Sequence, residues 1–116
     1  MNKRLLGNEK EQIAVKYLES FGYKILERNF YIRGAEADII AIDNKTLCFI
    51  EVKFRRNDKH GLAEDAVTLT KQKRIIKLAR YYIMTHQELE HLDVRFDVVA
   101  INGSELSLIK SAFEAC

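Results

Sequence analysis

The sequence predicts an α/β fold in which a mixed β-sheet lies between helices. Two segments, residues 8–21 and 63–86, carry apolar residues at helical spacing. Three strand-like segments linked by short turns lie between them, and two more follow the second helix. Short turns join antiparallel strands, whereas a helical crossover joins parallel ones. The order therefore predicts an antiparallel three-stranded unit, a parallel fourth strand and a final hairpin.

Length and composition indicate one globular domain over residues 1–116. The chain is 47% hydrophobic and 31% charged, with a formal net charge of only +2. This overall charge does not by itself indicate nucleic-acid binding. Its two cysteines, Cys48 and Cys116, cannot form a disulfide framework or a zinc ligand set. No stretch reads as a signal peptide or a membrane span, so we expect a cytoplasmic protein with no membrane partner.

The first predicted helix ends at Gly22, a helix stop signal. Its apolar face consists of Ile13, Ala14, Tyr17, Leu18 and Phe21. Glu11 falls at the edge of this face, where hydration is its simplest role.

The first strands are predicted at residues 23–31, 36–42 and 46–54, and the last two form a hairpin around Asp43-Asn44-Lys45. The second helix should place an apolar face against the sheet and Lys73, Lys77 and Arg80 on another face. Strands at residues 94–101 and 105–109 follow, joined at Asn102-Gly103. We expect residues 110–116 to be loose or a short helix.

Three charged residues interrupt the hairpin's apolar strands. Alternation puts Glu51 and Lys53 on one strand face with Leu47 and Phe49, and Asp38 with Ile40 and Ile42 on the preceding strand. Ionised groups beside a core are costly unless they are paired or bind a cation. One interpretation is a divalent-metal site with a lysine for an anionic substrate. The other is a simple ion pair of Lys53 with Glu51 or Asp38.

Basic residues cluster directly after this hairpin. They are Lys53, Arg55, Arg56, Lys59, Lys71, Lys73, Arg74, Lys77 and Arg80. Such a cluster either gives a positive field beside the candidate metal site or is a solvated helix face.

Several motifs together resemble the bacterial YraN proteins, also called the UPF0102 family. They are Glu11-x-x-Ala14-x-x-Tyr17-Leu18, Gly22-Tyr23, Arg28-Asn29, Glu36-x-Asp38-Ile39-Ile40, Phe49-Ile50-Glu51-Val52-Lys53-x-Arg55 and Arg95-Phe96-Asp97-Val98-Val99. The likeness extends from about Gly7 to Ile101. Lys10 and Ala35 replace glycines that usually precede Glu11 and Glu36 in that family.

The resemblance implies a restriction-endonuclease-like αβββαβ core, grouped with the PD-(D/E)xK nucleases near archaeal Holliday-junction resolvases. It implies that Asp38 and Glu51 are the acidic catalytic positions and Lys53 the catalytic lysine, with Glu11 and Glu36 in auxiliary roles. Mg²⁺ or Mn²⁺ would bind Asp38, Glu51 and the Val52 carbonyl.

The expected function is therefore metal-dependent cleavage of DNA phosphodiester bonds, with branched or junction DNA as a candidate substrate. The basic cluster would contact the DNA backbone. A homodimer and a DNA-processing protein are further candidate partners. Two rival interpretations stay open: a non-catalytic nucleic-acid-binding module, and an interaction protein that keeps the nuclease fold.

Overall fold

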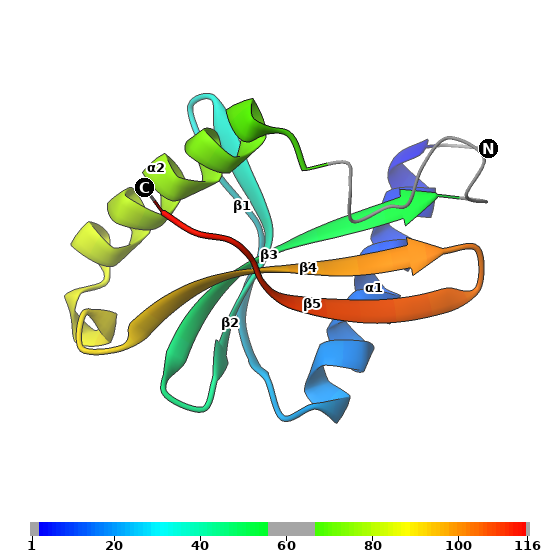
Figure 1. The fold of residues 1–116 in the computed structure, drawn as a ribbon, viewed down its shortest axis with the longest axis horizontal. Helices are drawn as coiled ribbons and strands as arrows, with labels where there is room; N and C mark the ends of the chain where they lie inside the picture. The colour runs from blue at the N-terminus through cyan, green and yellow to red at the C-terminus, as the bar shows by residue number, and fades with distance from the viewer. Residues whose placement is uncertain (1–2, 56–66, 116) are drawn as a thin grey trace.

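The structure, a computed structural model, describes residues 3–55 and 67–115, and it contains two α-helices and one five-stranded sheet (Figure 1). The elements in chain order are α1 (Lys3–Ser20), β1 (Lys24–Ile32), β2 (Ala35–Asp43), β3 (Thr46–Arg55), α2 (Leu69–Thr85), a 3₁₀ turn η2 (Gln87–Leu89), β4 (Asp93–Asn102) and β5 (Glu105–Phe113). In the part of the chain described here, no helix is long and apolar enough to cross a membrane.

The sheet has the predicted mixed topology. Its strand order is β1-β2-β3-β4-β5, and only the β3–β4 pair is parallel. α2 lies in the connection between these two strands, as a parallel pair requires. The predicted α/β class, a mixed sheet flanked by helices and compatible with an αβββαβ core, is confirmed.

Each face of the sheet has its own apolar core. On the α1 face, Ala14 and Leu18 pack with Ile39, Cys48 and Ile50. On the α2 face a second set is buried: Ala37, Ile40, Leu47, Phe49, Ile75, Leu78, Ala79, Tyr82 and Phe96. Leu47 and Phe49 are therefore on the α2 face, which fixes the direction of Glu51 and Lys53 further along β3.

Both helices begin elsewhere than predicted. α1 begins at Lys3, earlier than the predicted residue 8. α2 begins at Leu69 because the Thr68 hydroxyl caps it by accepting a hydrogen bond from the Lys71 N–H at 3.2 Å. The sequence predicted an earlier start, at residue 63, but residues 63–66 lie outside the described part of the chain. Residues 67 and 68 are not helical.

The prediction of a loose or helical segment after residue 109 was wrong for its described residues up to Phe113. β5 continues to Phe113, whose ring stacks on Phe96 at 5.0 Å between centroids. The sequence did not predict this extension because Lys110 and Ser111 are polar and interrupt the apolar pattern of the strand. Ser111 has φ 53° and lies at an irregularity of the β4–β5 pairing, so strict alternation is lost there.

Candidate functional site

The predicted acidic residues lie where β2 and β3 stop pairing. Their ladder runs from Asp43↔Thr46 to Ile39↔Ile50. At the next position the Asp38 carboxylate replaces a backbone partner: its Oδ2 accepts the Val52 N–H at 2.8 Å. A residue in an extended strand directs its N–H and C=O to the same side, so the Val52 carbonyl also faces Asp38. Asp38, Glu51 and Val52 are thus brought together at a fork in the sheet.

Glu51 is the unusual member of this group. Its side chain is only 3% exposed, and within the described residues neither carboxylate oxygen has a hydrogen-bond partner. Lys71 Nζ lies 3.0 Å from Oε2, which makes an ion pair without good hydrogen-bond direction. Burial, and then the neighbouring charge of Asp38, raise the pKa of Glu51 from 4.5 to about 8.

Lys53 and Lys71 converge on Glu51 from different elements. Lys53 comes from β3, and Lys71 comes from the first turn of α2. Burial lowers the pKa of Lys53, and the neighbouring positive charge of Lys71 lowers it further. The cluster therefore combines two carboxylates with two lysines, and the pKa of Lys53 is lowered from its ordinary value.

The auxiliary acids Glu11 and Glu36 lie at the margin of the site. Glu11 is partly buried on α1, with one oxygen 3.7 Å from Arg28 Nη2. Burial raises its pKa, and the charges of Asp38 and Glu36 act in the same direction, so the three carboxylates are electrostatic neighbours. Glu36 is exposed on β2.

Asp38 and Glu51 are the two carboxylates of the cluster that could hold a cation. Across residues 3–55 and 67–115, no three His, Cys, Asp or Glu side chains gather as one metal-binding group. A divalent ion here would therefore complete its coordination with backbone oxygen, water or substrate, which is usual for Mg²⁺. The Val52 carbonyl is the backbone oxygen placed for this.

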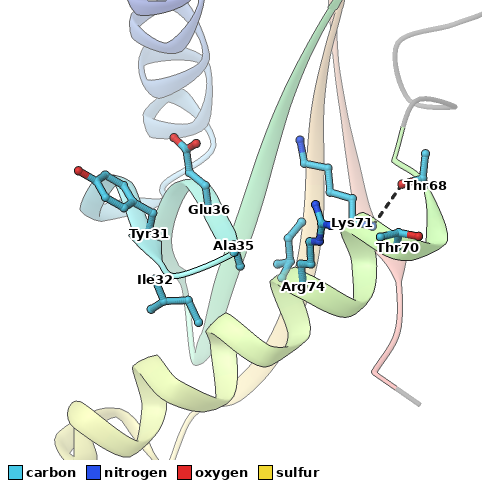
Figure 2. A pocket seen from close by; sticks show the side chains of 10 residues that line it. Tyr31, Ile32, Ala35, Glu36, Thr68, Thr70, Lys71 and Arg74 are labelled. Carbon is cyan, nitrogen blue, oxygen red and sulfur yellow. Dashed lines mark hydrogen bonds between the residues drawn. The ribbon is translucent and has the colours of Figure 1, made fainter.

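A groove of about 620 Å³ lies between the β1–β2 turn and the start of α2, and it adjoins this cluster through Lys71. Figure 2 shows Lys71 and Arg74 reaching from α2 toward the turn, where Ile32 and Ala35 form the opposite wall. The α2 wall is thus cationic, whereas the turn wall also carries the Glu36 carboxylate and Tyr31. Lys71 belongs both to the groove and to the Glu51 ion pair.

The predicted nucleic-acid-binding residues divide into three groups. Lys71 and Arg74 line the groove. Arg55, Lys73, Lys77 and Arg80 are exposed at the end of β3 and along α2. Arg56 and Lys59 lie outside the described residues.

Two features of the molecule were not predicted from the sequence. The first is the contact of Lys71 with Glu51. Its signal is a lysine in the first turn of a helix, where the helix dipole disfavours a cation. The second is a buried network around Asp97, on the α1 face. Arg95 and Asp97, two residues apart on one face of a core strand, were its signal.

Fold and site together define an α/β protein with a mixed sheet whose strands β2 and β3 carry Asp38, the buried Glu51 and Lys53, with Lys71 of α2 paired to Glu51. The chain belongs to the UPF0102 family: the family model described as "Uncharacterised protein family UPF0102" matches residues 10–101. It is 45% identical to a UPF0102 protein of Lachnoclostridium phytofermentans, over 99% of this chain and 98% of that protein. It is also similar to UPF0102 proteins of Syntrophus aciditrophicus, at 48% identity over 93% of this chain and 87% of that one, and of Caldicellulosiruptor saccharolyticus, at 42% over 97% and 100%.

Proposed function

We propose that the protein is a metal-dependent endonuclease that hydrolyses phosphodiester bonds of DNA. Its catalytic residues would be Asp38, Glu51 and Lys53. The observation that carries this proposal is Glu51, a buried carboxylate without a hydrogen bond among the described residues, held beside Asp38 and two lysines. The raised pKa of Glu51 reflects the cost of ionising a carboxylate buried in this way, and a cation bound at the site would offset that cost.

The donor set fits Mg²⁺ or Mn²⁺. Asp38 and Glu51 offer hard carboxylate oxygens, and the Val52 carbonyl faces the same side as Asp38. A divalent ion bound there lowers the pKa of a coordinated water and offsets charge that develops on the phosphate.

Lys53 is suited to handle the attacking water. It lies on the same strand face as Glu51, and its pKa is lowered, so the neutral amine is more available than in an exposed lysine. In this form Lys53 can accept a proton from water, and in its charged form it can hold the phosphate. Glu11 and Glu36 would hold waters at the margin of the site.

The cationic wall of the groove and the outer face of α2 would bind the DNA backbone. Arg74 lines the groove, and Lys73, Lys77 and Arg80 continue along the helix surface. Contacts of this kind position the duplex without reading its sequence. Each phosphate neutralised contributes about −0.9 to the slope of log affinity against log salt. Branched DNA is the substrate to test first.

A second candidate is a nucleic-acid-binding module without catalysis. The Lys71–Glu51 ion pair favours it, because a lysine already supplies the positive charge that the buried carboxylate needs. In such a protein the cluster would be a structural ion network that is indifferent to divalent metal.

The two candidates differ in their response to metal, which thermal unfolding measures directly. We expect millimolar Mn²⁺ or Mg²⁺ to raise the melting temperature of the wild type, because an ion that binds only the folded state stabilises it. Glu51→Gln and Asp38→Asn should lose this rise. Glu19→Gln is the matched control, because Glu19 is an exposed carboxylate on α1 that has no role in the proposed site.

Cleavage of branched, flapped and single-stranded DNA in the same metal then tests catalysis. The wild type and Glu19→Gln should cut, whereas Glu51→Gln and Asp38→Asn should not. If the protein binds DNA without cutting it, and its melting temperature is the same with and without metal, it is the non-catalytic module instead.

A further inference from the structure

Lys71 takes part both in an ion pair with Glu51 and in the lining of the groove. Its Nζ lies 3.0 Å from Glu51 Oε2 inside the site, and the same side chain lines the groove. The Glu51 side chain is 3% exposed, whereas that of Lys71 is 39% exposed. The ion pair thus joins a buried carboxylate to a lysine side chain that is partly exposed to solvent.

The Lys71–Glu51 contact is suited to exchange. A lysine side chain has a flexible four-carbon stem, so its ammonium can move while α2 stays in place. No hydrogen bond fixes either Glu51 oxygen within the described residues. Lys71 therefore neutralises Glu51 without locking its geometry.

Lys71 and a divalent ion cannot both sit against Glu51 without strong repulsion. Like charges at contact distance repel more strongly in a partly buried site than in water, because the effective dielectric constant is lower there. Lys53 of β3 is a further basic side chain in the same cluster. A metal ion that binds Glu51 would therefore have to displace the Lys71 ammonium group.

The groove offers Lys71 an alternative partner when it holds an anion. Arg74 lies beside Lys71 on the same wall (Figure 2), so a phosphate bound against α2 would meet two cations, with the Glu36 carboxylate across the groove on the turn wall. Arg and Lys side chains that face one groove are typical of phosphate binding.

We propose that Lys71 is an exchangeable counter-ion, which neutralises Glu51 in the free protein and moves to a nucleic-acid phosphate in the groove, leaving Glu51 available to the divalent ion. This inference rests on the proposed function, because it concerns the same metal site. It implies that nucleic acid and metal favour each other's binding, and that the two effects are equal by linkage. The free protein would then bind metal weakly, and the metal site would be completed only when DNA is bound.

The test measures metal affinity by calorimetry, with Ca²⁺ as the probe ion and a short phosphorothioate DNA duplex as the probe nucleic acid. In the wild type, DNA should tighten Ca²⁺ binding by about 10-fold, within the usual range of coupling between sites. Lys71→Gln should bind Ca²⁺ about 10-fold more tightly than the wild type without DNA, and DNA should then add much less. Lys71→Met should show the same pattern, which covers the case that one variant folds poorly.

Two variants serve as controls. Lys71→Arg keeps the positive charge and should resemble the wild type. Lys73→Gln removes the same charge from an exposed position two residues along α2, and its Ca²⁺ affinity should stay close to that of the wild type.

Two failures are distinguishable. If Ca²⁺ binds the wild type but binds Lys71→Gln equally or more weakly, the exchange is wrong and the metal site stands. If Ca²⁺ binds none of these proteins, with or without DNA, the proposed metal site is wrong and the exchange falls with it.

Discussion

Two buried carboxylates in this sheet, Asp97 and Glu51, are in opposite chemical states. Asp97 is 0% exposed, and four hydrogen bonds reach it. Arg95 donates Nε to Oδ1 at 2.8 Å and Nη2 to Oδ2 at 2.9 Å, the Tyr23 hydroxyl donates at 2.9 Å and the Ser111 N–H donates at 3.0 Å. Glu51 is nearly as buried, but within the described residues neither of its oxygens has a hydrogen-bond partner, and its ion pair is with Lys71.

The difference between the two carboxylates suggests different roles: Asp97 stabilises the fold, whereas Glu51 belongs to the proposed site. A fully satisfied buried charge fixes the elements that surround it, and Asp97 ties β4 to β5 and to the segment after α1. An unsatisfied one costs stability and persists where it serves binding or catalysis. Substitutions at the Asp97 network should therefore act on folding, and those at the Glu51 cluster on activity.

The largest stability effect is expected for Asp97→Ala. This change leaves Arg95 and the Tyr23 hydroxyl partly buried without their main partner, which costs about 3–5 kcal/mol for a broken buried ion pair. Denaturant unfolding followed by circular dichroism measures the loss. If Asp97→Ala lowers the free energy of unfolding by less than about 1 kcal/mol, as loss of a surface pair does, Asp97 would not have the stabilising role that sets it apart from Glu51. Asp93→Asn, at an exposed position on the same strand, is the control.

Lys53→Ala should instead change activity with little change in stability. Loss of a residue that positions or deprotonates water lowers the cleavage rate by about 10²- to 10⁴-fold. Because Lys53 is not a ligand in the proposed site, Ca²⁺ affinity measured by calorimetry should remain close to that of the wild type. Equal losses of cleavage and metal affinity would contradict this division of roles.

The stability of the metal-free protein should depend on pH through Glu51. Its pKa is raised by burial from 4.5 to about 8 in the folded state. Between these values the folded state binds more protons than the unfolded state, so stability falls as pH rises. We therefore expect denaturant unfolding in the presence of a chelator to show declining stability between pH 5 and pH 8. Glu51→Gln should flatten this decline, and Glu19→Gln should not. A decline of the same size in Glu51→Gln would assign it to another group.

The fold could be predicted because its signals are local. Alternation along β3 placed Glu51 and Lys53 on one face, and the Asp43-Asn44-Lys45 turn joined β2 to β3. The long connection with α2 gave the parallel β3–β4 pair. Each of these depends on neighbouring residues or on the length of a connection.

The two charge networks could not be predicted because they join distant parts of the chain. Tyr23 and Asp97 are 74 residues apart and meet only when α1 and β4 are packed together. The Lys71–Glu51 pair depends on where α2 starts and how it crosses the sheet, and helical periodicity alone misplaced that start. The pattern identified Glu51 as charged, but not as lacking a hydrogen bond.

The smallest effect is expected at the outer edge of the Asp97 network, with Lys110→Ala. Lys110 Nζ lies 3.1 Å from Asp43 Oδ2, but its side chain is 51% exposed, and Arg95 Nη2 reaches the same oxygen at 2.7 Å. An exposed pair of this kind contributes at most about 1 kcal/mol, so denaturant unfolding should show a loss no larger than this. Combining Lys110→Ala with Asp97→Ala should give less than the sum if Asp43 couples the two through Arg95. Strict additivity would mean that the buried part of the network is complete without its exposed edge, and the energetic contrast with Glu51 would then rest on Arg95, Asp97 and Tyr23 alone.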